Sequence, residues 1–379
     1  MSDEFKLVHS GKEYFDLLES LISNAEDSIH LLVYTFIEDE TGRKIAQELI
    51  AAAERKVEVN LLVDAFGSKE LSDELIEAFY ESGIRFRKFS PYLTGHIYSA
   101  GRRMHMKAVV VDYSKILIGG INISNNYNGY KSTAWLDYAV LMKDEVIANN
   151  LTDYYWHLYN RKLSKRVYSG YSFENQACKI LINDWLYQTP AISRELNSLV
   201  ESSRKEITIM ISYFLPGRRF IRLLSEASKR GVKIKLINSA NWDIPFMRRA
   251  IHYLYPRLQR SHITIYEWKP SVLHSKVMVF DHQICSIGSY NINGLSRYNS
   301  LEMNAFVKNK TFVDQIKVEL NQLINDEKKV VRINQYEPGW FSNMLNWMNY
   351  KLVRASLSIM FLLINAERKD IDRGIHDSD

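Results

Sequence analysis

Cysteine is scarce in this chain, with 2 among 379 residues, Cys178 and Cys285. The pair lacks the close spacing of a metal site, and two thiols would make an unusual disulfide framework for a chain of this length. A disulfide-dense scaffold and a cysteine-based zinc fold are therefore excluded. We expect two buried thiols in a protein that resides in a reducing compartment.

Long hydrophobic runs are also missing. The longest unbroken apolar segment covers residues 359–364, far short of the roughly 20 residues that span a bilayer. The first residues, 1–6, are partly acidic and have no apolar core, which predicts neither a signal peptide nor an anchor. The expectation is a cytoplasmic protein that is at most peripheral, on the inner face of the cell membrane.

A strong excess of one charge and low-complexity tracts are absent as well. The net charge is +5 with 46% hydrophobic and 25% charged residues, which is ordinary globular composition. The mild basic excess favours anionic partners without choosing between nucleic acid and anionic lipid. The length allows two ordinary domains, or one large domain in two parts.

The chain contains two copies of one pattern of elements. An apolar run at 28–37, an amphipathic helix at 42–55 and a strand at 57–63 are matched by segments 206–215, 217–230 and 232–237. A second helix and a short strand follow in each copy, at 72–82 and 84–89, and near 246–254 and at 263–268. Strand, helix and strand with short connections predict parallel pairing.

The predicted fold class is therefore α/β: two similar halves, each a mostly parallel sheet covered by helices, packed about a pseudo-twofold axis. We place the halves at 1–165 and 166–330 and a C-terminal amphipathic helical segment at 331–379. Gly231 stands where a glycine commonly ends a helix, whereas Lys56 takes this place in the first copy.

Each half also carries a six-residue motif with identical spacing. The first copy consists of His105, Lys107, Asp112, Gly119, Gly120 and Asn122, and the second of His274, Lys276, Asp281, Gly288, Ser289 and Asn291. Two such matches by chance are very improbable at a background of roughly one in twenty per position. The motif therefore points to chemistry that needs both copies.

Histidine and lysine two apart on a strand face the same side, so both can face one cavity. We expect Asp112 and Asp281 to initiate turns and shape the site. Gly120 and Ser289 allow close approach of a ligand, and Asn122 and Asn291 can donate to a phosphate oxygen.

Two imidazoles and two ammonium groups suffice for a phosphodiester reaction without a metal or other cofactor. One neutral histidine attacks phosphorus while the other protonates the leaving alcohol, and the lysines and asparagines stabilise the developing charge. Asp137 and Glu302 follow the two motifs and are candidates to orient the histidines. The other histidines, including His30, His96 and His252, are expected to be ordinary core or surface residues.

Both motifs resemble the HKD signature of the phospholipase D superfamily, and the resemblance covers about residues 7–325. The first half is similar to the short B-type bacterial cardiolipin synthases. The segments that carry this likeness are YTFIEDETGRKIAQEL (34–49), LLVDAFGS (61–68), ESGIRFRKFSP (81–91), LIGGINIS (117–124) and LDYAV (136–140).

The resemblance implies transfer of a phosphatidyl group from one phosphatidylglycerol to another through a phosphatidyl-histidine, with glycerol leaving. It implies His105 as the nucleophile and His274 as the acid. Met104 and Met106 depart from the family pattern, where polar residues commonly flank the first histidine.

Three alternatives remain open at this point. A hydrolase would use water in place of the lipid hydroxyl. A nuclease of the same superfamily is disfavoured by the internal duplication and the weak positive charge, so no nucleic acid partner is expected. A non-catalytic scaffold would be expected to have an eroded motif, and neither copy is eroded.

The region 340–366 places apolar residues at helical spacing, with basic residues nearby. One interpretation is a helix packed on its own domain, and the other is a helix lying in the plane of a membrane. Trp340 and Trp347 favour the membrane. The expected partners are thus phosphatidylglycerol and, through this segment, a membrane surface.

Overall fold

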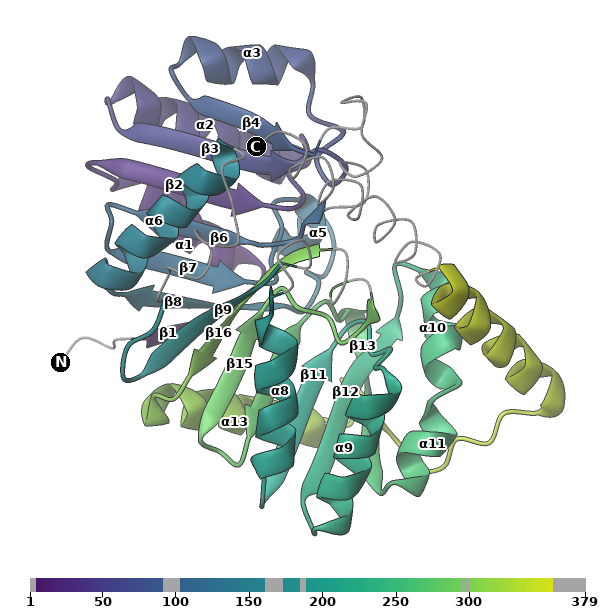
Figure 1. The fold of residues 1–379 in the computed structure, drawn as a ribbon. Coiled ribbons are helices and arrows are strands. Elements are labelled where there is room, and N and C mark those ends of the chain that lie inside the picture. The colour runs from purple at the N-terminus through teal and green to yellow at the C-terminus, as the bar shows by residue number, and fades with distance from the viewer. Residues whose placement is uncertain are drawn as a thin grey trace, which may run out of the picture.

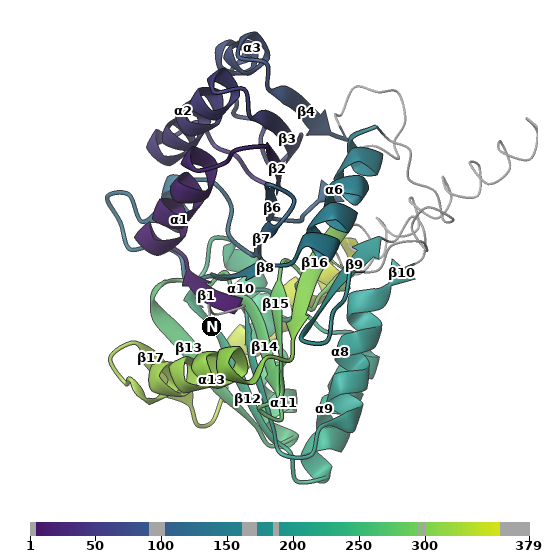
Figure 2. The ribbon, with the colours of Figure 1, turned by 90° about the vertical axis from the view of Figure 1, so that its left-hand side faces the viewer.

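The protein folds as two α/β halves, each built on its own sheet (Figures 1 and 2). The computed structural model describes residues 5–90, 103–160, 173–184, 189–294, 296 and 300–356. The predicted boundary at residue 165 lies outside these described residues. The strands and helices predicted from the duplicated pattern are present in both halves.

The first sheet has seven strands in the order β1-β8-β7-β6-β2-β3-β4. These are β1 (Phe5–His9), β2 (Ser28–Val33), β3 (Glu58–Asp64), β4 (Arg85–Phe89), β6 (Ala108–Val111), β7 (Lys115–Gly119) and β8 (Tyr138–Lys143). Its helices are α1 (Lys12–Ser23), α2 (Glu40–Glu54), α3 (Asp73–Glu81), the short α5 (Asn125–Asn128) and α6 (Glu145–Tyr159). Figure 2 shows α1 and α2 on one face of the sheet and α6 on the other.

The second sheet follows the order β10-β9-β16-β15-β14-β11-β12-β13-β17. Its strands are β9 (Cys178–Asp184), β10 (Thr189–Pro190), β11 (Glu206–Ile211), β12 (Lys233–Asn241), β13 (Ile263–Val272), β14 (Lys276–Phe280), β15 (Ile284–Gly288), β16 (Ser300–Val307) and β17 (Val330–Ile333). Its helices are α8 (Ala191–Ser202), α9 (Arg218–Lys229), α10 (Pro245–His252), α11 (Tyr255–Arg260) and α13 (Lys310–Asn325).

The α/β class and the duplication are confirmed, but the sheets are mixed instead of mostly parallel. Among the described strands, β2-β3-β4 and β11-β12-β13 pair in parallel, and so does a two-residue strand over 103–104 with β16. The motif strands β6 and β14 pair antiparallel with the neighbours on both sides. The physical reason is the short turn after each motif strand, since parallel strands need a crossover of a dozen or more residues.

Local sequence explains where the helices begin and end. The side chain of Ser72 accepts a hydrogen bond from the backbone of Leu75 and caps α3, and Asp39 caps α2 through Gly42. Gly231 ends α9 with φ +91°, as predicted. Lys56 adopts φ +74° at the matching place, so the first copy makes the same turn with a residue that is strained there.

Three hydrophobic cores hold the layers together. One fills the space between α1, α2, α3 and the first sheet. A second lies between α8 to α11 and the outer face of the second sheet. The third contains residues of both sheets with α6 and α13, so burial of apolar surface joins the halves into one body.

Backbone hydrogen bonds also cross the seam between the halves. The two-residue strand β5 (Arg103–Met104) pairs with β16 of the second half, and Leu136 bridges to Leu273. The backbone N–H of His105 donates to the carbonyl of Leu301, and that of His274 donates to Leu136, both at 2.9 Å. The exchange is reciprocal, as expected for two copies related by a pseudo-twofold axis.

After β17 the described chain ends in a helix over 340–356, the C-terminal helix, drawn in yellow in Figure 1. Val353 of this helix packs into the second half's core, whereas Trp340 is 80% exposed. The remainder of the predicted stripe, from 357 onward, lies outside the described residues. Across the described ranges, helices are too short or too polar to cross a bilayer.

Candidate active site

The two motif histidines line one cavity of about 350 Å³ at the seam. His105 follows β5 and His274 follows β13, and each precedes the motif strand of its own half. The sequence predicted that the two copies converge on a common site, and the cavity brings both rings there.

Each histidine is held by a carboxylate from the opposite half. Nδ1 of His105 lies 2.9 Å from Oε2 of Glu302, and Nδ1 of His274 lies 2.8 Å from Oδ2 of Asp137. Both carboxylates are almost fully buried. A proton held on Nδ1 leaves the lone pair on Nε2, which is the form a nucleophile or base needs. Asp137 and Glu302, the candidate orienting residues, therefore contact the histidines in a crossed arrangement.

The motif lysines are buried and are not among the described residues that line the cavity, although the sequence predicted that they face it. Nζ of Lys107 donates to the carbonyl of His105 at 2.6 Å. Nζ of Lys276 lies 2.7 Å from Nδ1 and 3.1 Å from Nε2 of His274, and 3.8 Å from Asp137. At this distance from the His274 ring, the Lys276 ammonium places positive charge next to any anion in the cavity. Burial lowers the pKa of Lys107 well below its usual range, although the Glu302 carboxylate opposes the shift.

Burial changes the protonation of these groups. It lowers the pKa of His105, where the Glu302 carboxylate works against the shift. It lowers the pKa of His274 further, aided by the Lys276 ammonium. Burial raises the pKa of Asp137 to about 7 and lowers that of Lys276 to about 8. These shifts favour the neutral form of both imidazoles near neutral pH.

Aromatic side chains surround the two rings. Tyr34 meets His105 edge-on at 4.9 Å between ring centroids. His274 is flanked by Tyr127 at 5.2 Å, Trp135 at 6.1 Å and Tyr213 at 6.5 Å. These walls restrict each ring and keep water from its faces.

Asp112 and Asp281 lie at the far ends of the motif strands from the histidines. Asp112 accepts from the backbone N–H groups of Glu26, Asp27 and Ser28. Asp281 accepts in the same way from residues 204–206. Because extended chain rises about 3.3 Å per residue, neither carboxylate reaches the cavity, as expected for turn residues that shape the site.

Gly120 and Ser289 sit next to the orienting carboxylates and outside the cavity's described lining. A Cβ atom at Gly120 would meet the Asp137 oxygens at 2.4 and 2.5 Å. Oγ of Ser289 donates to Oε2 of Glu302 at 2.5 Å. The sequence predicted that Gly120 and Ser289 contact a ligand directly. In the structure the carboxylates lie between these residues and the cavity, so the two residues position the carboxylates instead.

Asn122 and Asn291 do line the cavity. The carbonyl oxygen of Asn122 accepts from the backbone of Thr35, and that of Asn291 accepts from Oγ of Ser212. Nδ2 of Asn122 also donates one of its protons to the hydroxyl of Tyr127 at 3.0 Å. An amide carries two N–H donors, so its second N–H and the NH₂ group of Asn291 are the donors suited to an anionic oxygen.

Several residues of the site were missed from the sequence. Asp64 is buried and accepts from the backbone of Met104 at 2.9 Å, which fixes the segment that carries His105. Asp243 lines the cavity and accepts from the hydroxyl of Tyr213. The available signal was position: Asp64 ends an apolar strand, and the aromatic residues follow the first strand of each copy. Met104 and Met106 are fully buried in the central core.

Comparison with known proteins settles the family. The family described as "Cardiolipin synthase, PLD-like domain" matches residues 18–159 and 196–324. The chain belongs to this family. Cardiolipin synthase B of Escherichia coli (strain K12) is 30% identical over 332 residues, covering 85% of this chain and 80% of that protein. Cardiolipin synthase of Geobacillus kaustophilus (strain HTA426) is 28% identical and covers 81% of this chain, which matches 63% of that protein.

Solved structures extend the likeness at the level of fold. The phosphatidylserine synthase of Haemophilus influenzae Rd KW20 superposes with a TM-score of 0.76 at 13% identity, covering 94% of both chains. A polyphosphate kinase from Porphyromonas gingivalis gives a TM-score of 0.61 at 18% identity, over 94% of this chain and 53% of that one. As a cardiolipin synthase family member, the chain is an enzyme of the phospholipase D superfamily, as the doubled motif predicted.

Proposed function

We propose that the protein forms cardiolipin by transferring a phosphatidyl group from one phosphatidylglycerol to a hydroxyl of a second. The observation that carries this proposal is the pair of motif histidines in one cavity, each held by a buried carboxylate of the other half. The family match and the names of the relatives supply the lipid substrate class.

The reaction proceeds in two balanced steps. In the first, Nε2 of one histidine attacks phosphorus and forms a P–N bond, while the P–O bond to the headgroup glycerol breaks. The glycerol oxygen takes a proton from the other histidine and leaves. In the second, that histidine removes a proton from a hydroxyl of the incoming phosphatidylglycerol. Its oxygen then attacks phosphorus, the P–N bond breaks, and cardiolipin is released.

One histidine takes up the proton for the first step when the substrate binds. Burial favours the neutral form of both imidazoles, and a phosphodiester carries one negative charge, which favours protonation of a neighbouring histidine. The ammonium groups of Lys107 and Lys276 and the amides of Asn122 and Asn291 stabilise the charge on the nonbridging oxygens. We therefore propose that these side chains stabilise the charge without a metal ion.

The family resemblance assigns attack to His105 and proton donation to His274. Mass spectrometry of enzyme quenched during turnover with phosphatidylglycerol tests this assignment. A phosphatidyl adduct on the peptide that contains His105 supports it, whereas an adduct on the His274 peptide reverses the two roles. The surroundings make this test informative, because the carboxylate of Glu302 favours the protonated form of His105.

The cavity also bears on the rival functions. Among its described lining residues, Arg103 is the only lysine or arginine, and a nuclease would need a basic track for the nucleic acid backbone. Lipid hydrolysis differs from transfer only in the acceptor. The product of a vesicle assay distinguishes the two.

We expect His105→Gln and His274→Gln each to reduce turnover of phosphatidylglycerol vesicles by at least about 10⁴-fold, because each ring performs a separate step. The assay contains a chelator, and thin-layer analysis separates cardiolipin from phosphatidic acid. His157→Gln, which alters a histidine on α6 outside the cavity lining, is the matched control and retains full activity.

Phosphatidic acid as the main product would identify a hydrolase. Nicking of single-stranded DNA without lipid turnover would identify a nuclease. Near wild-type rates in either cavity variant would contradict the two-histidine mechanism.

A further inference from the structure

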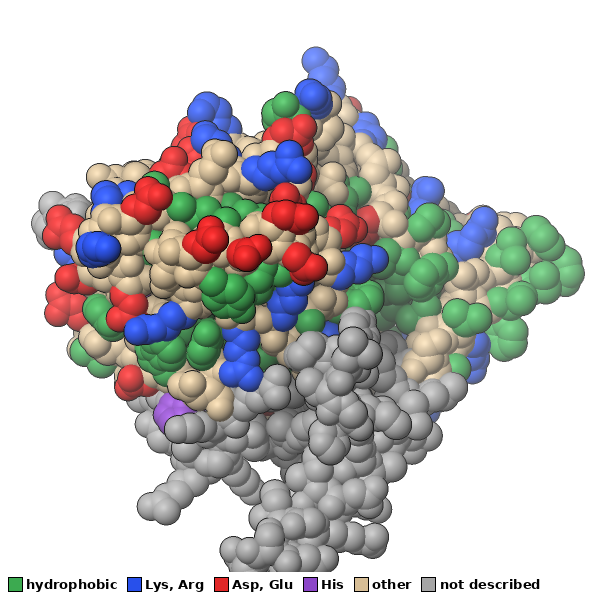
Figure 3. All heavy atoms as spheres, turned by 90° about the horizontal axis from the view of Figure 1, so that it is seen from above, with side chains coloured by type: hydrophobic (Ala, Val, Ile, Leu, Met, Phe, Trp, Pro, Cys, Tyr) green, Lys and Arg blue, Asp and Glu red, His purple; other side chains and the backbone are tan. Residues whose placement is uncertain are grey.

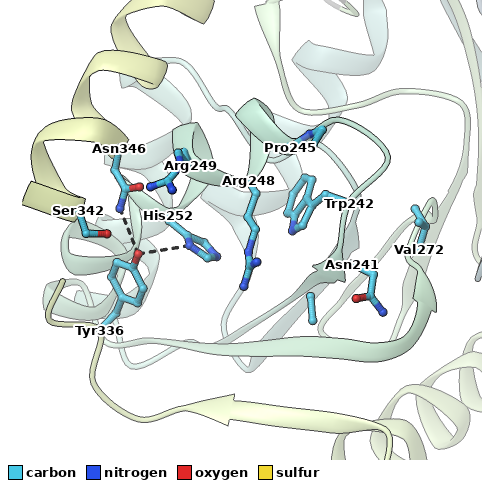
Figure 4. A pocket seen from close by; sticks show the side chains of 11 residues that line it. Asn241, Trp242, Pro245, Arg248, Arg249, His252, Val272, Tyr336, Ser342 and Asn346 are labelled. Carbon is cyan, nitrogen blue, oxygen red and sulfur yellow. Dashed lines mark hydrogen bonds between the residues drawn. The ribbon is translucent and has the colours of Figure 1, made fainter. Parts of the chain in front are cut away.

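A second cavity, of about 650 Å³, lies between α10, β12 and the C-terminal helix (Figure 4). Its walls include Trp242, Arg248, Arg249, His252, Tyr336 and Asn346. It shares no described lining residue with the active-site cavity. The proposed reaction does not use it.

The charge of this second cavity suits an anion. Arg248 and Arg249 are exposed along its wall, and neither forms an ion pair with another described residue. No aspartate or glutamate is among the described lining residues. The carboxylate of Glu267, which contacts the lining residue His252, is already engaged by Nε2 of His252 and the hydroxyl of Tyr255, each at 2.9 Å. Two unneutralised guanidinium groups therefore face the space.

A hydrogen-bond donor in the same wall lacks an acceptor. Nε1 of Trp242 is buried and makes no hydrogen bond with the described residues, and Figure 4 shows its ring beside Arg248. A buried indole N–H without a partner is costly. Because the atom is covered in the structure, a ligand oxygen between Trp242 and the arginines would satisfy it after a small shift of the indole ring.

The opposite wall is fixed in place. The hydroxyl of Tyr336 lies 3.2 Å from Nδ1 of His252 and accepts from the amide of Asn346 at 3.1 Å (Figure 4). Asn346 is 2% exposed. This chain of contacts ties the C-terminal helix to α10 and keeps the cavity open between them.

Two elements that line the cavity, the C-terminal helix and α10, also carry exposed apolar side chains. Figure 3 shows hydrophobic side chains gathered on the protruding edge of the molecule. Those of the C-terminal helix are Trp340, Phe341, Trp347, Met348 and Leu352, between 45% and 80% exposed, and Phe246 of α10 is 48% exposed. Lys351 lies over the Trp347 ring at 5.9 Å. Tryptophan, aliphatic residues and lysine in this arrangement are typical of helices that lie at the membrane interface.

We propose that the second cavity binds the phosphate of an anionic phospholipid headgroup while the exposed apolar side chains of the C-terminal helix and α10 enter the surrounding bilayer. The inference rests on the proposed function only in taking lipid as the source of the phosphate. The segment after β12 connects the two sites, because Trp242 lines the second cavity and Asp243 lines the active site. A lipid held here keeps the active-site cavity close to the membrane that contains its substrate.

Co-sedimentation with vesicles of equal parts phosphatidylglycerol and phosphatidylcholine tests the proposal. The full chain carries His105→Gln so that no lipid is turned over. Adding Arg248→Gln with Arg249→Gln should weaken binding roughly 10- to 30-fold, from about 1 kcal/mol for each basic residue at an anionic surface. The matched control, Arg222→Gln with Lys229→Gln on α9, removes the same charge from exposed positions and leaves binding within about 2-fold.

Two further arms separate specific recognition from general attraction. Trp242→Phe keeps the ring, removes the donor, and should weaken binding to phosphatidylglycerol vesicles while leaving binding to pure phosphatidylcholine vesicles unchanged. Inorganic phosphate at millimolar concentration should compete weakly; if it abolishes vesicle binding, free phosphate is the ligand and the lipid proposal is overturned. Equal losses in the two double variants would also overturn it.

Thermal melting of each variant verifies the fold. If the wild type makes no cardiolipin but Arg248→Gln with Arg249→Gln still loses binding, the proposed function fails and this inference stands. If the wild type makes cardiolipin and the double variant binds normally, the inference alone fails.

Discussion

Gly120 and Ser289 occupy equivalent positions in the two motifs, yet they contact the neighbouring carboxylates differently. The first leaves room for the Asp137 carboxylate, and the second hydrogen-bonds to the Glu302 carboxylate. The two copies thus hold the same kind of group by different means. Serine, the residue at position 289, would therefore not fit at position 120.

Gly120→Ser therefore tests the positioning of His274. The new Cβ would collide with both oxygens of Asp137 and displace the carboxylate from the ring. We expect kcat on phosphatidylglycerol vesicles to fall on the order of 10²-fold, the usual effect of a shift of about 1 Å in an active site. Near-UV circular dichroism confirms the fold.

The companion variant, Ser289→Ala, loses the hydrogen bonds of the hydroxyl with Glu302 and with the backbone of Met303, and creates no collision. Its kcat should fall less than about 10-fold, since Glu302 still holds His105. Equal activity of Gly120→Ser and the wild type would contradict the account of Asp137 as the partner of His274.

Much of the active site could be predicted at the level of residues. The motif histidines and asparagines line one cavity, as the doubled motif implied. The lysines do not line it, because the histidines precede the motif strands and strand periodicity does not hold each His and Lys on one face. The orienting acids Asp137 and Glu302 were also named. Which acid serves which histidine could not be predicted, since it depends on how the halves interlock. Among the aromatic residues, Tyr34 and Tyr213 are marked only by their place after the first strand of each copy, whereas Tyr127 and Trp135, like Asp243, carry no local signal of their own.

At the level of elements, the turns after β6 and β14 are built alike. Asp112 and Asp281 adopt φ +50° and +51°, and each carboxylate accepts from three successive backbone N–H groups. The turns join antiparallel strands. This pairing was predictable from the sequence, because only three residues separate β6 from β7. The parallel pairing of the first strands was predictable because a helix follows each of them.

Asp281→Ala should destabilise the protein by on the order of 2 kcal/mol, because three backbone donors lose a charged acceptor. Urea unfolding measures this change. The kcat per folded molecule should stay close to that of the wild type, because the carboxylate lies far from the cavity. A folded but inactive variant would show that Asp281 takes part in the chemistry; unchanged stability would contradict the turn account.

For the whole molecule, an ion pair at the seam adds to the shared core. His9 of β1 contacts Glu319 of α13 at 2.7 Å and Glu13 at 2.6 Å. The hydrogen bond with Glu319 is the main reason that its pKa is raised to about 9, although burial opposes the shift. His9 is therefore charged at neutral pH and links the two halves.

This link gives a pH-dependent stability. Because the pKa is higher in the folded protein than the ordinary 6.5, the contribution is complete below pH 6.5 and disappears as the pH rises through about 9. The Tm of the wild type should exceed that of His9→Asn by a margin that shrinks over this range. Lys12→Gln, which breaks an exposed pair within α1, should show no such trend. A constant margin from pH 6 to 10 would contradict the account.

The interlocked halves were only partly predictable. The duplication implied a twofold arrangement, but the strand β5, which joins the second half's β16, has two residues and no periodicity to reveal it. The second cavity likewise depends on where the C-terminal helix docks. Such contacts arise from tertiary packing and leave little trace in local sequence.

The crossed carboxylates make the two repeats interdependent. If the chain were cleaved between them, each piece would keep its own histidine and lysine but lose the acid that orients that histidine. Neither fragment alone could retain partial turnover, and mixing the fragments would restore it only if they reassembled across the seam. Asp137 and His274 are 137 positions apart in sequence, yet a substitution at either one disables the same catalytic group. Selection therefore acts on the two positions together.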